Sequence, residues 1–431
     1  MNLTEPILLL VVLMAIVAVA SVFFKGRMTC VTPVVFLGCA VITLIAGMGI
    51  KIREIVEGPF VYLDSSMQIL TGAVFCYLMY KNGTFEYLFN KIIAKKRASF
   101  VQMLLLVLFI GLPGMISGSA LVCVATTGMM AGKYLLDKGV DKAKVVEVVA
   151  VSSVLGMLLP PLNAPAMMGI VGRQGSYPGS FEGFFVLCLI AAAPALIVYA
   201  IMAGKRILGD VEAAEVEKKG SIVCLIPMLV VLLLVLSHNF LYTTMPFLGY
   251  PLIYTIGFVL AIFLKVEKAN ILLSAADGVR AATIEVALMC ACASANEILT
   301  VVGTNGTIAA WRIINEPNEL VVVMGLFAVV LVLGFLLGPS MAVAFCGFVI
   351  YLVTNSFGND GTSMLALALV LAVVFLVSLR GGIVDLTGKA LGVTGVSSKS
   401  ILGKILVPVI VILIMAVVFY VSGSSLSGLI I

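Results

Sequence analysis

The chain has 431 residues, of which 62% are hydrophobic and 11% are charged, and its mean hydropathy is +1.24. A water-soluble domain cannot have this composition, so the sequence indicates an all-α polytopic membrane protein. The formal net charge of +5 reflects orientation in the membrane and gives no sign of nucleic-acid binding.

Uninterrupted apolar segments of about 20 residues, the length of a membrane-spanning helix, recur along the chain. They lie near residues 6–24, 29–50, 63–80, 181–204, 221–240, 247–265, 283–303 and 403–427. The first has no Lys or Arg before it and no clear cleavage pattern after it, so we interpret it as a retained span. Two short amphipathic stretches, residues 51–62 and 267–283, are predicted to lie along the two membrane interfaces.

Two longer apolar stretches are interrupted near their middle. Residues 99–135 contain an SGS motif that begins at Ser117, and residues 319–355 contain a GPS motif that begins at Gly338. Backbone groups freed from a helix are costly in hydrocarbon, so a break persists only where it lines a site or is buried in protein. We interpret both stretches as re-entrant hairpins.

Two further stretches predict spanning helices that are broken in the middle. Residues 145–172 contain LPPLN, which ends at Asn163, and proline there lacks the N–H that a helix needs. Residues 364–394 contain RGGIVD, which begins at Arg380 and ends at Asp385. A Gly-Gly pair takes the place of Pro-Pro in this second break.

The second half of the chain repeats the first at a nearly constant spacing. Three landmarks set this spacing: the NGT motif at Asn82 against that at Asn305 (305 − 82 = 223), Ser117 against Gly338 (221), and Pro160 against Gly381 (221). Each half then holds five spanning helices, one of them broken, and one hairpin. Because five is odd, the second half enters the membrane from the opposite side. The sequence therefore predicts two inverted repeats, residues 1–204 and 221–431, joined by a cytoplasmic linker at 205–220.

The distribution of basic residues predicts the orientation, because cytoplasmic loops are enriched in Lys and Arg. With both termini outside, the predicted inner loops collect most of the basic residues, among them Lys25, Arg27, Lys138 and Lys389. The sequence therefore favours an N-terminus on the outer side.

The paired breaks predict a binding site at the repeat interface. A half-helix that ends leaves carbonyls with partial negative charge, and one that begins presents amides with partial positive charge. One tip can therefore hold a cation beside an anion, and hydroxyl and amide oxygens suit a hard ion such as Na⁺. The candidate cation ligands are Ser117, Gly118, Ser119, Pro160 and Asn163 in the first half, and Gly338, Ser340, Gly381, Gly382 and Asp385 in the second. The alternative is a proline kink and a packing seam of small residues.

Charged residues at membrane depth are costly and usually functional. Arg380 is predicted to bind a substrate carboxylate, with Ser119, Asn163 and Ser340 as further substrate ligands. The alternatives are that Arg380 pairs with Asp385 or that it extends toward the inner interface.

Four other polar residues lie in or beside the apolar segments. Asn296 and Glu297 either line the transport path or lock helices together. Asp64 and Glu285 lie near expected interfaces and are predicted to be solvated.

The sequence does not indicate an enzyme. Ser117 and Ser119 lack a G-x-S-x-G elbow, and the single histidine, His238, is remote from them. The nine cysteines form no CxxC pair, so neither a disulfide framework nor a zinc site is predicted. A channel and a transport-inactive assembly subunit remain as alternatives to a carrier.

The motifs at the first two breaks resemble a known family. The segments GLPGMISGSALVCVATTGMMAGK (residues 111–133) and SSVLGMLLPPLNA (residues 152–164) resemble the large permease subunit of tripartite ATP-independent periplasmic (TRAP) transporters. This is the DctM-like branch of the ion-transporter superfamily, and residues 67–88 resemble the segment that precedes its first hairpin. The resemblance covers essentially the whole chain.

The resemblance implies an elevator-type, sodium-driven importer of small carboxylates in the inner (cytoplasmic) membrane. It also implies two partners, a small four-helix membrane subunit and an extracytoplasmic solute-binding protein. Two positions depart from the family pattern: Gly338 replaces a usual acidic residue, and Gly381-Gly382 replaces a usual Pro-Pro pair. A stand-alone carrier of a different anion, or one coupled to H⁺, therefore stays an alternative.

Overall fold

The computed structural model describes residues 4–93, 97–171, 181–208, 222–241, 248–264, 270–357, 361–393, 395–396 and 398–429. Within these ranges the chain is helical and contains no strand, as predicted. Eight of the described helices are long and apolar enough to cross a membrane, and three shorter apolar helices accompany them.

The first half supplies eleven α-helices. Their bounds are α1 Thr4–Phe23, α2 Met28–Ile45, α3 Ile52–Glu57, α4 Leu63–Lys81, α5 Thr84–Ile93, α6 Ser99–Ser117, α7 Ala120–Cys123, α8 Met129–Asp137, α9 Lys142–Leu158, α10 Ala164–Val171 and α11 Phe185–Leu208. A 3-10 turn at Gly58–Tyr62 joins α3 to α4, and a π-helical turn at Val124–Gly128 joins α7 to α8. The rest of the predicted linker after Leu208, through residue 220, lies outside the described residues.

The second half follows the same order. Its helices are α12 Ile226–Phe240, α13 Tyr250–Phe263, α14 Ile271–Val301, α15 Thr304–Asn315, α16 Glu319–Leu337, α17 Pro339–Tyr351, α18 Gly361–Val377, α19 Ile383–Ala390, α20 Ser398–Val421 and α21 Gly423–Leu426. The helices of both predicted hairpins and of both predicted broken spans end at or just before the predicted motifs: α6 ends at Ser117, α9 at Leu158, α16 at Leu337 and α18 at Val377.

Both predicted amphipathic stretches are helical where the structure describes them. Residues 52–81 form one uninterrupted helical run through α3, the 3-10 turn and α4, and α14 is a single helix of 31 residues. The described part of each stretch therefore continues into the neighbouring span as one long helix, and its place along a membrane interface stays a prediction. The Asn270 side chain starts α14 by accepting a hydrogen bond from the backbone N–H of Leu273 (3.1 Å).

The two long helical runs pack against each other through reciprocal glycine contacts. A Cβ atom on Gly58 would lie 3.0 Å from the Cα atom of Ser294, and one on Gly278 would lie 2.8 Å from the Cα atom of Val74. The two glycines are 220 positions apart, and so are Val74 and Ser294 (278 − 58 and 294 − 74). Such a reciprocal exchange is what a two-fold axis relating the two halves produces.

The turns before α5 and α15 obey the same spacing. Gly83 (φ +79°) and Gly303 (φ +81°) hold the left-handed conformation that these turns require. The hydroxyl of the next residue then donates to a carbonyl of the other half: Thr84 to Cys224 (3.1 Å) and Thr304 to Pro6 (3.0 Å). The structural partner of Gly83 is thus Gly303, whereas the NGT landmark matched it to Gly306, which lies inside α15.

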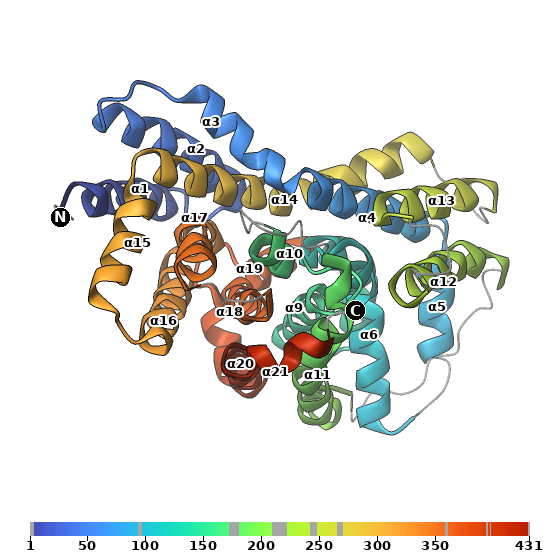
Figure 1. Cartoon of the computed structure of the whole chain (residues 1–431). Coiled ribbons are helices and arrows are strands. Elements are labelled where there is room, and N and C mark those ends of the chain that lie inside the picture. Colours follow the sequence, from blue (N-terminus) through green and yellow to red (C-terminus); the bar gives the residue numbers. More distant parts are fainter. Residues whose placement is uncertain are drawn as a thin grey trace.

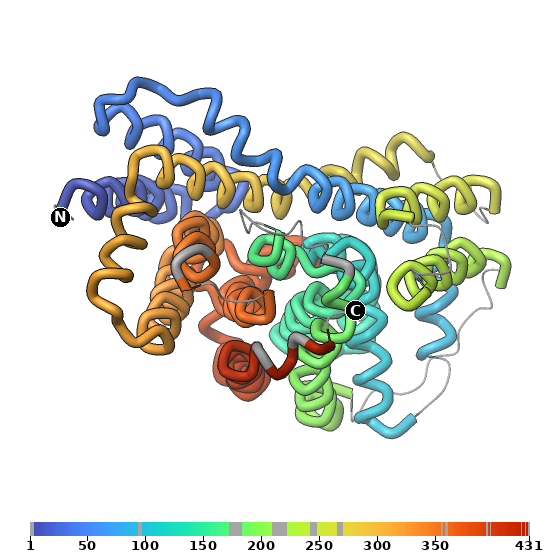
Figure 2. The backbone as a smooth tube through the Cα atoms, viewed as in Figure 1, coloured from blue at the N-terminus to red at the C-terminus, as the bar shows by residue number. Residues whose placement is uncertain are grey.

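The helices divide into two parts: in Figure 1, α1–α4, α13 and α14 run along the top of the view, above most of the other helices, and α12 lies below α13 at the right. We call α1–α4 and α12–α14 the scaffold layer, in which α14 packs against α4 and α2, and α13 against α4 and α12. We call α6–α11 and α16–α20 the bundle, and the tube in Figure 2 shows α5 and α15 running between the two parts at opposite ends. The parts touch where α4 meets α6 and where α14 meets α17.

Glycine-to-alanine substitution should have opposite effects on stability at Gly278, which packs against α4, and at Gly306, which is in open space. Gly278→Ala forces a Cβ against backbone atoms of α4, so it should destabilise the fold by about 1–3 kcal/mol. Gly306→Ala adds a Cβ with nothing within 4 Å. It should leave stability unchanged or raise it by up to about 1 kcal/mol, because alanine favours a helix. Thermal unfolding of the purified protein measures both, and an unchanged Tm in Gly278→Ala would contradict the packing.

Candidate substrate and cation site

The first hairpin turns at Gly118. This residue has a left-handed backbone conformation (φ +68°), which glycine adopts without a steric penalty. Its N–H donates to the Gly114 carbonyl (2.7 Å) and closes α6. Ser119 then begins the second arm, and its Oγ accepts a hydrogen bond from the Val122 N–H (3.1 Å). A Cβ at Gly118 would lie 3.1 Å from the Ala164 nitrogen, so the tip is pressed against the start of α10.

The first break pairs its backbone with this tip. The N–H of Leu162 donates to the Met115 carbonyl (3.0 Å), and the N–H of Ala164 donates to the Gly118 carbonyl (3.3 Å). Asn163 spans the break: its Nδ2 donates to the Leu158 carbonyl (3.1 Å), and its Oδ1 accepts from the N–H of Ala166 (3.0 Å). The Pro160–Pro161 peptide bond within the break is cis. The predicted residues of the first half thus lie together and buried.

The two serines of the tip keep part of their bonding capacity. Ser117 Oγ donates to the Pro113 carbonyl (2.6 Å) and accepts from the N–H of Ser119 (3.3 Å). A hydroxyl oxygen has two lone pairs, so one lone pair of Ser117 receives no hydrogen bond from the described residues. The same count holds for Ser119, which donates one hydrogen bond and accepts one.

The second hairpin docks on its break in the same way. The N–H of Leu379 donates to the Phe335 carbonyl (2.9 Å), and Ser378 Oγ donates to the Gly334 carbonyl (2.8 Å). Gly338 forms the turn with φ +108°, and a Cβ there would lie 2.8 Å from the Arg380 carbonyl oxygen. The hydroxyl of Ser340 lies 3.2 Å from that of Thr32 on α2, so this tip contacts the scaffold layer.

Arg380 and Asp385 do not form the ion pair that was one alternative. No ion pair joins them in the part of the chain that the structure describes. Instead, the Arg380 Nη1 atom is buried and has no hydrogen-bond partner there. The Asp385 carboxylate interacts with the Gly381 backbone and lies near Lys389. Gly26 packs on this break, because a Cβ at Gly26 would lie 2.8 Å from the Arg380 carbonyl oxygen.

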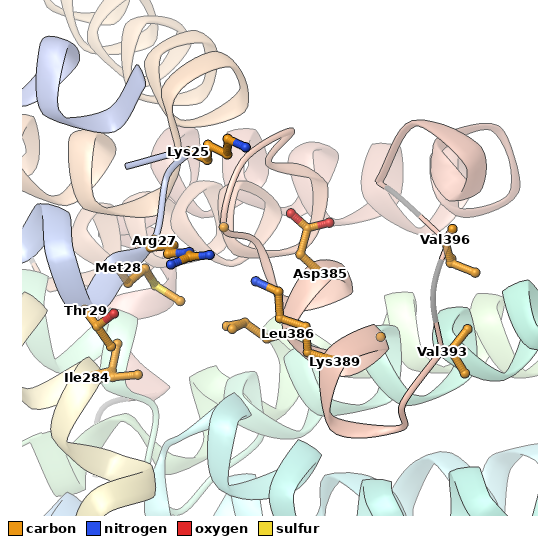
Figure 3. Close-up of a pocket in the computed structure, with 13 residues that line it drawn as sticks. Lys25, Arg27, Met28, Thr29, Ile284, Asp385, Leu386, Lys389, Val393 and Val396 are labelled. Carbon is orange, nitrogen blue, oxygen red and sulfur yellow. The ribbon is translucent and has the colours of Figure 1, made fainter. Parts of the chain in front are cut away.

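A basic cavity of about 560 Å³ opens beside the second break. Figure 3 shows Lys25 and Arg27 from the turn between α1 and α2, and Asp385 and Lys389 from α19, at its wall. Three cationic side chains and one carboxylate suit an anionic guest of small size. The sequence analysis used these basic residues only to predict orientation, because nothing along the chain indicates that residues 25 and 389 line one cavity.

Glu285 is buried, and its predicted solvation is wrong. Its side chain is on α14 and the residue is 3% exposed. Oε2 accepts a hydrogen bond from Ser119 Oγ, and Oε1 accepts one from the N–H of Leu121 (3.2 Å). The prediction failed because it placed residue 285 at the start of a span, whereas α14 starts at Ile271. A carboxylate in an apolar segment was the signal that could have identified it.

Asn296 locks helices together, which was one of its two predicted roles. Asn305 Nδ2 on α15 donates to the carbonyl and to Oδ1 of Asn296 on α14, both at 3.1 Å. The contact fixes the turn between these helices at the end of the scaffold layer.

The role of Asn163 in spanning the first break predicts a stability effect. Asn163→Ala leaves the Leu158 carbonyl and the Ala166 N–H without their side-chain partner in a buried position, which should cost about 1–3 kcal/mol. Asn315→Ala is a matched control, since that amide bonds the Trp311 carbonyl on the exposed end of α15. The control should change stability by less than about 0.5 kcal/mol. Thermal unfolding tests the pair, and equal Tm values for the two variants would contradict this role.

Comparison with known proteins identifies similar sequences and folds. The sequence profile of the family described as "Tripartite ATP-independent periplasmic transporter, DctM component" matches residues 7–380. The crystal structure of the YdaH transporter of Alcanivorax borkumensis, described as having an unusual topology, is similar with a TM-score of 0.59. The match covers 87% of this chain and 88% of that chain at 11% identity, a likeness that concerns the fold alone. No curated protein matches the sequence.

Proposed function

Because the chain belongs to the family of DctM components of tripartite ATP-independent periplasmic transporters, we propose that it imports a small organic anion, coupled to Na⁺. The family is one of transporters and not of enzymes, and the apolar helices make this member a multi-pass membrane protein. The substrate class, the coupling ion and the partners are the proposal.

The docking of each hairpin tip on its broken helix is the observation that carries this function. In both halves a helix ends and another begins at a buried point inside the bundle, beside a second interruption. Carbonyl ends and amide ends therefore lie together away from lipid, which suits a cation next to an anion. Broken helices at membrane depth are typical of carriers with a central site.

The coupling ion is proposed to bind at the two tips. Its ligands are Ser117, Gly118, Ser119, Pro160 and Asn163 at the first tip, and Gly338, Ser340, Gly381, Gly382 and Asp385 at the second. The remaining lone pairs of the tip serines and the carboxylate of Asp385 support this, because Na⁺ prefers oxygen ligands. The absence of an acidic residue at Gly338 leaves the second tip the weaker of the two.

The substrate is proposed to be a carboxylate held by Arg380, with Ser119, Asn163 and Ser340 as further ligands. The unpartnered Arg380 Nη1 supports the role of Arg380, since a guanidinium nitrogen in a buried position needs an acceptor. The basic cavity at Lys25 supports an anionic substrate, which would pass through it on the side of the predicted cytoplasmic loops.

Transport is proposed to occur by movement of the bundle against the scaffold layer, with the N-terminus outside the inner membrane. The family implies a small four-helix membrane subunit and an extracytoplasmic solute-binding protein as partners. Because the sequence departs from the family pattern at two places, transport should also be measured without these partners. A stand-alone carrier would transport without them, an H⁺-coupled carrier would respond to a pH gradient, and an inactive assembly subunit would not transport at all.

Uptake into proteoliposomes tests the function. We expect saturable accumulation of one or more members of a carboxylate panel under an inward Na⁺ gradient, with partners added where needed, because the tips join a cation site to an anion site. A pH gradient in place of Na⁺ separates H⁺ coupling. Non-saturating flux without gradient dependence would indicate a channel, and no uptake with all partners present would indicate an assembly subunit.

Arg380→Lys tests the substrate ligand. A lysine keeps the charge but loses the bidentate geometry, so the half-saturating substrate concentration should rise about tenfold or more while the protein stays folded. Arg53→Lys, on the exposed helix α3 where Arg53 pairs with Glu57 (2.7 Å), is the matched control and should leave uptake unchanged. Unchanged half-saturation in Arg380→Lys would remove Arg380 from the substrate site.

A further inference from the structure

Glu285 joins the scaffold layer to the bundle at the tip of the first hairpin. Its carboxylate comes from α14 in the scaffold layer, and both donors, Ser119 Oγ and the Leu121 N–H, belong to the hairpin in the bundle. Of the described residues, none with a cationic side chain forms an ion pair with Glu285. The carboxylate is therefore held by the hairpin alone.

Breaking these hydrogen bonds while Glu285 stays buried is energetically unfavourable. A buried carboxylate without hydrogen bonds is strongly unfavourable, and hydrogen bonds to a charged acceptor are stronger than neutral ones. The donors also lie at the start of a helical arm, where backbone amides carry partial positive charge. The hairpin and Glu285 thus stabilise each other as long as they stay in contact.

The other long helix of the scaffold layer, α4, contacts the same hairpin next to its tip. A Cβ at Gly72 on α4 would lie 2.7 Å from the Ile116 carbonyl oxygen, and the Cys76 thiol lies 3.8 Å from the Pro113 carbonyl oxygen. The end of α6 therefore rests on α4 while the start of α7 is bonded to α14. Any movement of the bundle along the scaffold layer must break both contacts.

We propose that Glu285 is a latch that holds the first hairpin tip against the scaffold layer in this conformation and must release for the bundle to move. The proposal rests on the proposed function, because it presupposes that movement. While the latch is closed, the hydroxyl proton of Ser119 and the N–H of Leu121 are committed to Glu285. A ligand that needs either donor binds only after release.

Among the described residues, the latch has no counterpart at the second hairpin. At the spacing of 220 residues, the position that matches Glu285 is Ser65, which has no carboxylate (285 − 65 = 220). The second tip meets the scaffold layer instead through the neutral contact between Ser340 and Thr32. The charged contact is therefore confined to the first hairpin.

Two native cysteines report on release. Cys76 is fully buried between α4 and α6, so it becomes accessible when the scaffold layer and the bundle separate. Cys188 on α11 is equally buried, but it lies inside the bundle beside Asn163. Modification by N-ethylmaleimide, measured for each cysteine by peptide mass spectrometry on the full chain in lipid nanodiscs, distinguishes separation from unfolding.

Glu285→Gln and Glu285→Ala should raise the modification rate of Cys76 about tenfold, because they remove the charged acceptor that favours the closed state. The rate at Cys188 should not change. Glu147→Gln is the matched control: Glu147 is also buried, but its ion pair with Arg206 joins α9 to α11 within the bundle, so Cys76 should stay protected.

An unchanged Cys76 rate in the Glu285 variants would overturn the proposal. If both cysteines became accessible in those variants, Ser119→Ala would distinguish release of the latch from unfolding. It removes one hydrogen bond to Glu285 from the hairpin side and leaves the buried carboxylate in place. Ser119→Ala must then raise the Cys76 rate alone, and any other result overturns the latch. The labelling needs no substrate, so absent uptake would reject the proposed function and leave this result standing.

Discussion

Backbone hydrogen bonding inside an apolar bundle is the constraint on which the other features of this structure depend. A hairpin turn and a broken helix each leave backbone groups without helical partners, and hydrocarbon supplies none. Here the two interruptions of each half satisfy each other, through Leu162 and Met115 in the first half and Leu379 and Phe335 in the second. The tip must therefore lie on the break. As a consequence, the helix ends that form the proposed ion and substrate site come together.

The long helices of the scaffold layer give this bundle a fixed surface to rest on. Gly58 and Gly278 bring the two helical runs into close backbone contact as an antiparallel pair. Both members of the pair contact the first hairpin, α4 through Cys76 and α14 through Glu285. A carrier that moves its bundle needs such contacts to be few and breakable.

Much of the fold was predictable because its signals are local. Gly118, Pro160 and Gly338 break helices for reasons that a few neighbouring residues supply, so the sequence located all four interruptions. The rest depends on contacts between distant segments. The burial of Glu285 follows from α14 being continuous, and the cavity joins Lys25 to Lys389 across most of the chain. The alignment of the two halves at Asn82 and Asn305 was wrong because the two NGT motifs share only their sequence. The left-handed turn that matches Gly83 is at Gly303.

The central claim is that the bundle moves as one body against the scaffold layer, and distances between spin labels test it most directly. Labels at Arg53 on α3 and at Lys138 after α8 report across the two parts, and labels at Lys138 and Lys399 on α20 report within the bundle. In lipid nanodiscs with and without Na⁺, the first pair should give two distance populations whose ratio shifts, while the second pair keeps one. A single unchanged distance for the first pair, or equal changes in both, would contradict the claim.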